Sequence, residues 1–332
     1  MLKGNTRVYA QEDFGKTELP ENQAGLDAPG ILSNGGLPLM NLKLSAQRKR
    51  DVTGWSFMLP MLICFSTFVI YPVFDTVKTS FYGFDYTKYY WTGLDNYKEV
   101  FTDKVFLTSI LNTFIFVLYI VPISTIAALL ISILINRQAA RAQGVYKAIF
   151  YIPGVTSVVS LTMVWQYIFN NQFGIANYFL KLLGMEPANW LGLELAYPSL
   201  SFIMVSLSLG ANIVVITAGL NGIPPEMYEA AYIDGARGLS AFFKITLPLL
   251  KPTMLYVIVT ATIGAFQVFV IIFLMTGGGP GYSTTTILML IYREAFMNMS
   301  FGRASTMGFV LCAIVCFIAF IQFKFLSSDI EY

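Results

Sequence analysis

The chain has 332 residues, of which 56% are hydrophobic and 12% are charged, and its formal net charge is +2. Soluble domains contain about 25% charged residues, so this composition, with a mean hydropathy of +0.63, indicates a polytopic membrane protein. The small net charge gives no basis for a nucleic-acid partner. The sequence contains no histidine, the commonest metal ligand and general base. We therefore expect no metal and no cofactor bound by this chain.

The N-terminal region, residues 1–54, has the composition of a cytosolic tail. Residues 1–37 are polar and mixed in charge, which is typical of a disordered segment, and they contain no apolar core of the signal-peptide kind. Residues 37–50 mix apolar and basic side chains at loosely helical spacing. This stretch is either a helix that lies on the membrane surface or a plain basic flank.

Six apolar segments follow, each close to the roughly 20 residues needed to cross a bilayer. They predict an all-α protein with about six transmembrane helices, at residues 55–74, 106–135, 148–169, 197–220, 252–275 and 305–325. Prolines 60, 122 and 153 fall inside these segments, where neighbouring helices can satisfy the freed backbone groups. We expect the first span and an outer loop in 55–105, a transmembrane domain in 106–326 and a C-terminal tail in 327–332.

Basic residues predict the orientation of the spans, because Lys and Arg are enriched in cytosolic loops. They gather before the first span and after the second and fourth spans: Lys43, Arg48, Lys49, Arg50, Arg137, Arg141, Lys147, Arg237, Lys244 and Lys251. On the opposite side, the lysines are balanced by acidic residues. Both termini and the loop formed by residues 221–252 are therefore predicted to face the cytosol.

The loop 221–252 carries the local signals of a small, rigid helical projection. Pro224 and Pro225 suit the start of a helix, where the missing N–H costs nothing. Gly235 or Gly238 can end that helix in a left-handed cap. Further on, Ser240 is predicted to cap a second helix. Pro248 and Pro252 are predicted to break that helix before the next span.

A motif lies in this loop: Glu229-Ala230-Ala231, then Asp234-Gly235-Ala236, then Ile245 and Pro248. Its order and spacing resemble the "EAA" loop of binding-protein-dependent ABC importer permeases. A second run, with Phe266 to Phe269, Met275 to Pro280 and Ser283 to Thr286, is similar to the carbohydrate-uptake branch, whose members carry maltose, lactose-type oligosaccharides and glycerol phosphate. The resemblance covers residues from about 106 to the C-terminus.

The resemblance implies a type I importer permease in a bacterial inner membrane that moves a sugar or oligosaccharide, with a sugar acid as an alternative. An extracytoplasmic solute-binding protein would deliver the substrate, and a related second permease subunit would complete the pair. Two ABC ATPase subunits, holding ATP and Mg, would dock on the loop through Glu229, Ala230, Ala231, Asp234, Gly235 and Ala236. The glycine-rich run 277–283 lacks the G-K-[ST] of a phosphate-binding loop, so we expect an outer turn there and no ATP hydrolysis by this chain.

The substrate pathway requires polar groups within the membrane, and such groups usually face a cavity or a partner. Candidates by residue type are Asn112, Gln166, Asn212 and Gln267. The resemblance places substrate contacts near residues 207–212 and 261–268, which selects Gly210, Asn212, Phe266 and Gln267. Several aligned positions are Ala, Gly or Val, so a high-affinity site is not expected. The alternative to lining the pathway is an interhelical hydrogen bond for Gln267 and plain packing for Phe266.

Two further expectations concern other parts of the chain. Residues 170–196 predict a short amphipathic helix that ends at Gly184, with Trp190 as an anchor at the membrane interface. The rival functions are a secondary transporter or channel, which would place charges or broken helices in mid-membrane, and a membrane enzyme. The spans carry essentially no charge away from their ends and no catalytic constellation, which favours the permease.

Overall fold

The computed structural model describes residues 39–85 and 87–326. The predicted tails, 1–37 and 327–332, lie outside these ranges. The chain divides into two compact units, Met1–Ile63 and Cys64–Tyr332, and each is described by itself.

The first unit contains most of helix α1 (Leu39–Phe65). Its side chains from residue 47 onward are exposed, and Pro60 is accommodated within the helix. The predicted boundary at residue 54 falls inside this continuous helix. No helix-breaking residue other than Gly54 stands at that point, and a single exposed glycine costs only about 1 kcal/mol in a helix. An interfacial position for residues 37–50 stays a prediction.

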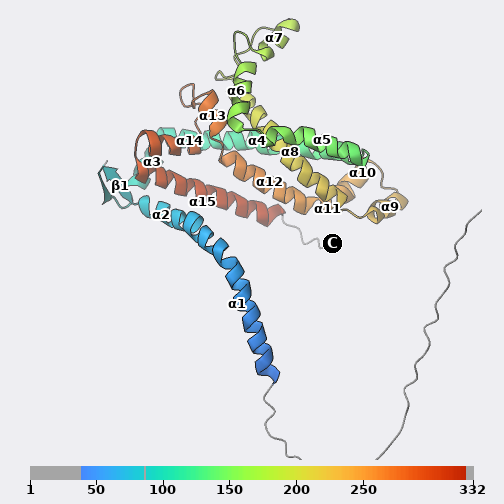
Figure 1. The fold of residues 1–332 in the computed structure, drawn as a ribbon. Coiled ribbons are helices and arrows are strands. Elements are labelled where there is room, and N and C mark those ends of the chain that lie inside the picture. The colour runs from blue at the N-terminus through green and yellow to red at the C-terminus, as the bar shows by residue number, and fades with distance from the viewer. Residues whose placement is uncertain (1–38, 86, 327–332) are drawn as a thin grey trace, which may run out of the picture. The chain divides into compact units, whose positions relative to one another are not determined.

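The second unit is almost entirely helical, which confirms the all-α prediction (Figure 1). Its elements are η1 (Ser66–Ile70), α2 (Tyr71–Thr79), β1 (Tyr82–Asp85), β2 (Lys88–Trp91), α3 (Asp95–Thr102), α4 (Lys104–Asn136), α5 (Ala140–Val155), α6 (Val158–Ile168), α7 (Ile175–Leu182), α8 (Ala196–Asn221), α9 (Pro225–Ile233), α10 (Leu239–Ala241), η2 (Phe242–Thr246), α11 (Leu247–Leu249), α12 (Lys251–Phe266), α13 (Val270–Met275), α14 (Ile287–Tyr292), η3 (Arg293–Met297) and α15 (Phe301–Leu326). The elements labelled η are π-helical turns. In the described ranges, β1 and β2 form the only sheet, an antiparallel hairpin.

Five helical stretches are long and apolar enough to cross a membrane: Gln47–Thr79, Lys104–Asn136, Ala196–Asn221, Lys251–Met275 and Phe301–Leu326. They confirm five of the six predicted spans. The predicted span 148–169 is bent instead, because α5 and α6 meet at 94°. Pro153 lies three residues before the bend, where its ring disturbs the helical hydrogen-bond ladder, and Thr156 then takes an extended conformation with ψ 147°.

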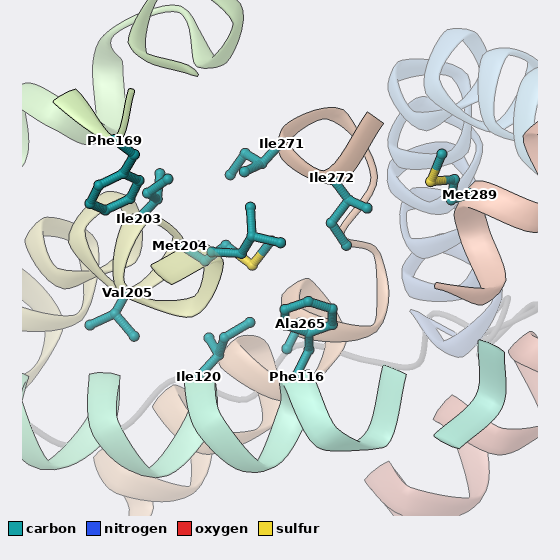
Figure 2. Close-up of a cluster of buried hydrophobic side chains, with 11 residues drawn as sticks. Phe116, Ile120, Phe169, Ile203, Met204, Val205, Ala265, Ile271, Ile272 and Met289 are labelled. Carbon is teal, nitrogen blue, oxygen red and sulfur yellow. The ribbon is translucent and has the colours of Figure 1, made fainter. Parts of the chain in front are cut away.

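The core of the second unit forms where α4, α8 and α12 pack together. One cluster gathers side chains from α4, α8, α12, α13 and α14, including Phe116, Ile203 and Ile272, which are fully buried (Figure 2). A second cluster continues along α4 and α8 through Ala128, Ile213 and Ile216. Hydrophobic packing therefore binds the helices that carry the loop 221–252 into one body.

A glycine allows α5 to approach α8 closely. A Cβ atom at Gly210 would collide with the backbone of Phe150 and Tyr151 in α5. Small residues commonly permit such close helix contacts in membrane proteins. The geometry therefore assigns Gly210 to helix packing.

Gly210→Ala should destabilise the protein, because overpacking a tight contact costs about 1–3 kcal/mol. The thermal unfolding of the purified protein in nanodiscs measures this loss. Gly144→Ala is the matched control, since it lies in α5 and a Cβ there would meet nothing within 4 Å. Equal midpoints for both variants would contradict the assignment.

Candidate functional site

The loop between α8 and α12 forms a helical projection that begins with α9. Pro224 takes the position before the helix, with ψ 135°, and Pro225 begins it. Glu226 lies in the first turn, where a carboxylate suits the positive end of the helix dipole. The predicted helix start is confirmed.

Gly235 ends α9 as predicted. Its φ is +80°, a conformation that costs other residues about 1–2 kcal/mol. The Ala236 N–H donates to the Ala231 carbonyl at 2.8 Å, and the Gly235 N–H donates to the Tyr232 carbonyl at 3.1 Å. This pair of hydrogen bonds is a Schellman motif. It turns the chain sharply away from the exposed end of α9.

The second half of the loop differs from the prediction. Gly238, with φ +55°, precedes α10, so Ser240 lies inside the helix and does not cap it. Pro248 does not break the helix either. The π-helical turn η2 precedes it, where the Leu247 N–H donates to the Phe242 carbonyl, and this wider turn accommodates the proline ring. The helical path is interrupted at Leu250, between α11 and α12, two residues before Pro252.

The exposed face of α9 combines carboxylates with apolar groups. Glu226, Glu229, Ala230 and Ile233 share one helix face by spacing, and all four are exposed, Ile233 to 84%. The other predicted contact residues differ in exposure: Asp234 and Gly235 are exposed, Ala236 is half-buried, and Ala231 is buried. Next to this face, the Arg237 guanidinium lies 4.2 Å from the centre of the Tyr232 ring.

The projection is tied to the membrane helices at its base. The hydroxyl groups of Tyr228 in α9 and Thr246 in η2 are hydrogen-bonded at 3.0 Å. Tyr228 also packs on the cluster that contains buried Leu220, Ile223 and Leu250. Because these residues lie at the ends of α8 and α12, α9 is linked to both helices by short, packed connections.

A cavity of about 410 Å³ lies along α8 and α12, with contributions from α4 and α13. Small residues leave its space open: Ala211, Ala261, Gly264 and Ala265. Its polar groups come from Ser208, Asn212, Tyr256 and Thr260. Asn212 is 8% exposed, and its Nδ2 is buried without a hydrogen-bond partner among the described residues. The cavity is therefore mainly apolar, with one amide available for a polar guest.

Of the four residues predicted to line a pathway, the structure brings only Asn212 to this cavity. Gly210 packs on α5, as described above. Phe266 is fully buried in the core, where its ring meets Phe114 edge-on at 5.4 Å, so the packing alternative describes its position. Gln267 is exposed at the end of α12; its backbone N–H donates to the Gly264 carbonyl at 3.2 Å, and its side chain makes no hydrogen bond with the described residues. No interhelical hydrogen bond is found there.

Two other polar candidates hold the glycine-rich turn in place. Asn112 Nδ2 donates to the carbonyls of Tyr282 and Thr285 at 2.8 and 2.9 Å, and its Oδ1 accepts from the Tyr197 hydroxyl at 2.6 Å. Gln166 Nε2 donates to the Leu274 carbonyl at 2.6 Å. The side chains of Asn112 and Gln166 are therefore used to bind backbone carbonyls of the chain.

The structure confirms the predicted helix end at Gly184 and shows how Trp190 is held. Gly184 ends α7 with φ +73°, as expected. Trp190 is half-buried: its indole N–H donates to Asn177 Oδ1 at 2.9 Å, and its ring stacks on Phe169. Its indole is therefore engaged by the protein, and its place at the membrane interface stays a prediction.

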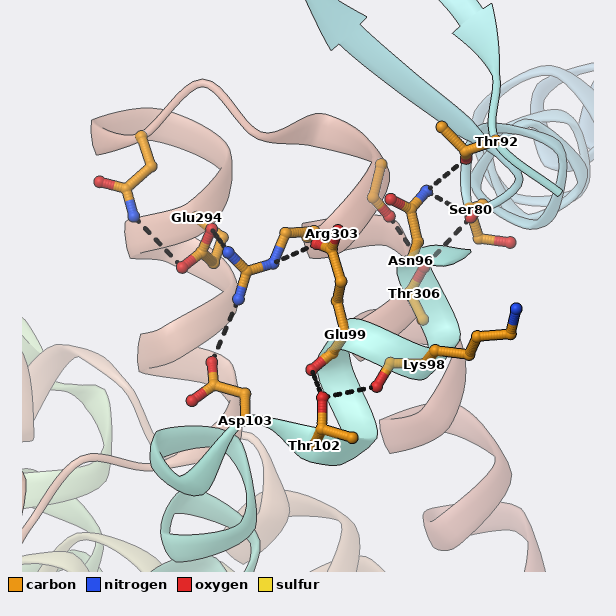
Figure 3. A network of polar contacts seen from close by, with 12 residues as sticks. Ser80, Thr92, Asn96, Lys98, Glu99, Thr102, Asp103, Glu294, Arg303 and Thr306 are labelled. Carbon is orange, nitrogen blue, oxygen red and sulfur yellow. Dashed lines mark hydrogen bonds and ion pairs between the residues drawn. The ribbon is translucent and has the colours of Figure 1, made fainter. Parts of the chain in front are cut away.

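Sequence reasoning missed an ionic network around Arg303 (Figure 3). The guanidinium lies 3.1 Å from Asp103, 3.8 Å from buried Glu294 and 3.9 Å from Glu99. These residues come from α3, the start of α4, η3 and α15, so one cation joins four segments. Three acids spread over about 200 residues carry no local pattern that would have revealed it.

Comparison with known proteins agrees with this geometry. Residues 101–331 match the family model described as the inner membrane component of binding-protein-dependent transport systems. The probable ABC transporter permease protein YesP of Bacillus subtilis (strain 168) is 33% identical over 86% of this chain and 94% of its own length. The lactose transport system permease protein LacF of Rhizobium radiobacter is 31% identical over 84% of this chain and 95% of its own.

A solved structure shows the same fold. A chain of a bacterial alginate ABC transporter, crystallised with an alginate pentasaccharide-bound periplasmic protein, aligns with a TM-score of 0.74 and 22% identity. The alignment covers 85% of this chain and 96% of that one. The present fold is that of a multi-pass membrane subunit of a transporter. The chain belongs to the family of binding-protein-dependent transport system inner membrane components.

Gly235→Val should disrupt the end of α9, because a β-branched side chain strongly disfavours positive φ, whereas Gly235→Asn should be tolerated, since Asn adopts this conformation more readily. We expect the Val variant to lose ATP-dependent uptake in proteoliposomes and the Asn variant to retain most of it. Gly222→Ala is the control, because Gly222 has φ −78° and a Cβ there makes only ordinary contacts. Equal uptake by all three variants would show that the cap is not needed.

Proposed function

We propose that this chain is the permease subunit of an ATP-driven importer that moves a sugar or oligosaccharide across a bacterial inner membrane. The projecting, exposed face of α9 is the observation that carries the proposal, and family membership supports it. The name of the lactose permease relative supports a sugar as substrate, delivered by an extracytoplasmic binding protein. A sugar acid is compatible with the same architecture.

In this proposal α9 is the contact for a cytosolic ATPase. The basic residues at the ends of the spans put the loop on the cytosolic side. Glu226 and Glu229 offer carboxylates to Arg or Lys of the partner, and the protruding Ile233 offers an apolar anchor of the kind that dominates docking energies. Gly235 permits the chain to leave this face without covering it.

The short connections at the base of α9 explain how ATPase motion would reach the membrane. Tyr228, Leu220 and Leu250 bind α9 to the ends of α8 and α12, so the projection and these helices move together. The cavity lies between the same two helices. Closure of an ATPase pair would thus change the walls of the pathway directly.

The partner set follows from the number of projections. This chain offers one α9, while an ATPase pair has two docking clefts in the family that the chain belongs to. A second, related permease subunit would supply the other projection and the facing wall of the pathway. The ATPases would bind ATP and Mg, and this chain would have no catalytic role.

The cavity suits passage better than tight binding. A sugar has many hydroxyl groups, whereas the cavity supplies only the Asn212 amide and the hydroxyl groups of Ser208, Tyr256 and Thr260. Two of these hydroxyls already donate to helix carbonyls, from Ser208 to Val205 and from Thr260 to Tyr256. We propose that Asn212 contacts the substrate in transit and that Gln267, exposed at the end of α12, contacts it outside the cavity.

The rival function, an ion-driven carrier or channel, lacks its usual chemistry here. Such proteins place ionisable residues or broken helices in mid-membrane. One bent pair is present, α5 and α6 at 94°, so the helix break does not separate the two functions and the charges do. Within α4, α8 and α12, Lys104 and Lys251 are the only ionisable side chains of the Asp, Glu, Lys and Arg types, and each is the first residue of its helix. An energy source outside this chain therefore agrees better with these spans.

Ile233→Glu should weaken ATPase binding by about tenfold or more, because it removes an apolar anchor worth at least ~1.4 kcal/mol. Affinity purification of the assembled complex, with the retained ATPase quantified, measures the effect. Leu183→Glu is the matched control, since Leu183 is 75% exposed at the end of α7. Undiminished ATPase retention by Ile233→Glu would refute docking on this face.

Gly264→Leu should block transport without preventing assembly, because its side chain would occupy the cavity. A Cβ at Gly264 meets nothing within 4 Å, and the same holds for Gly308 in α15. Gly308→Leu is therefore the control. We expect proteoliposome uptake to be lost only in the Gly264 variant, with ATPase retention normal in both. Normal uptake by Gly264→Leu would remove this cavity from the pathway.

A further inference from the structure

The β1–β2 hairpin presents a group of exposed aromatic rings. Tyr89, Tyr90 and Trp91 follow one another in β2 and are 56%, 53% and 66% exposed. Across the hairpin, Phe84 pairs with Tyr89 and Tyr82 pairs with Trp91. The ring centres of these pairs are 4.9 and 5.2 Å apart. The hairpin thus carries exposed aromatic rings on both faces: Tyr89 and Trp91 share one face with Phe84 and Tyr82, and Tyr90 lies on the opposite face, over Gly83.

The hairpin lies where two membrane-length helices have their ends. The stretch Gln47–Thr79 ends three residues before Tyr82, and Phe301, the first residue of α15, packs edge-on against Phe84 at 5.3 Å. One helix therefore ends, and another begins, at the level of this hairpin. By length and composition, this end of both stretches lies toward one surface of a membrane.

Buried hydrogen bonds fix the hairpin at this level. Asn96 Nδ2 donates to the carbonyls of Ser80 and Tyr82 at 2.8 and 3.0 Å, and Thr306 in α15 donates to the Ser80 carbonyl at 3.2 Å (Figure 3). A Cβ at Gly302 would collide with the Tyr82 carbonyl. The backbone at the start of the hairpin is consequently fixed to α3 and α15.

The chemistry of the exposed rings fits the interfacial layer of a bilayer. Tyr and Trp combine an apolar ring with one polar group and are enriched at the level of the headgroups. Lys88, exposed at the start of β2, can direct its ammonium group toward phosphates. In water, the same rings would be a solubility liability, and a two-stranded hairpin is only marginally stable without an environment to pack against.

We propose that the β1–β2 hairpin is a membrane-interface anchor whose rings Tyr89, Tyr90 and Trp91 contact the headgroup and glycerol region of the lipid. Trp91 is a better candidate for this role than Trp190, whose indole is bound to Asn177 and stacked on Phe169. The anchor sets the depth of α2 and α15 in the bilayer through the contacts of Asn96 and Phe84.

Tryptophan quenching by brominated phosphatidylcholine tests this anchor. The assembled transporter is placed in nanodiscs whose lipids carry bromine either near the headgroup or near the end of the acyl chain. We expect Trp91→Phe to remove a fluorescence component that headgroup-proximal bromine quenches more strongly. Trp190→Phe is the control and should leave that component in place. The double variant Tyr90→Trp/Trp91→Phe should restore it, because it returns an indole to the neighbouring exposed position.

Two results would overturn the proposal. If iodide in the buffer quenches the Trp91 component and brominated lipid does not, the hairpin stands in water. If neither quencher reaches it in the assembled complex, a protein partner covers the rings. Should Trp91→Phe fail to assemble, Tyr90→Trp with Trp91 retained must increase the lipid-quenched signal, and an unchanged signal would also refute lipid contact.

Discussion

The fold depends on one constraint: within a bilayer, backbone N–H and C=O groups must find their partners inside the protein. Regular helices meet it by themselves, and each irregular segment here is supported by side chains. The carbonyls of Tyr282 and Thr285 are bound by Asn112, and that of Leu274 by Gln166. At the interruption between α12 and α13, the Val268 carbonyl accepts from the Thr286 hydroxyl. These polar side chains in the spans thus form hydrogen bonds to backbone carbonyls.

The side-chain amides of Asn112, Gln166 and Asn212 therefore fall into two groups: those that are hydrogen-bonded to backbone carbonyls, and one whose nitrogen has no partner among the described residues. The amide groups of Asn112 and Gln166 donate to carbonyls of the chain. Asn212 lines the cavity, and its Nδ2 is buried without a partner among the described residues. Leaving a buried donor unpaired costs about 1–3 kcal/mol. The two kinds of amide look identical in sequence, and only the neighbouring backbone distinguishes them.

Local chemistry decided which parts of the fold were predictable. The start of α9 at Pro225 and its end at Gly235 depend on neighbouring residues in the chain, and so they were anticipated. Ser240 and Pro248 were misjudged because a π-helical turn, set by tertiary packing, lies between them. The bend between α5 and α6 follows Pro153, which was expected to be tolerated within a straight span. The assignment of Phe266 to the core depends on contacts across the fold. The Arg303 network joins acids that are remote in sequence, and no periodicity encodes it.

The sparse polar lining of the cavity bears on where selectivity resides. A membrane site with many hydrogen bonds would hold a sugar in place and slow its release, whereas a mainly apolar wall with a few donors lets it pass. Under the proposed function, discrimination would belong to a protein that meets the substrate first, outside the membrane. The permease would need only to open at the right time, and the timing would be set where α9 joins α8 and α12. In such an arrangement, the small residues in the cavity would keep the affinity for the substrate low. The firmly packed base of α9 would connect the cavity walls mechanically to the energy source.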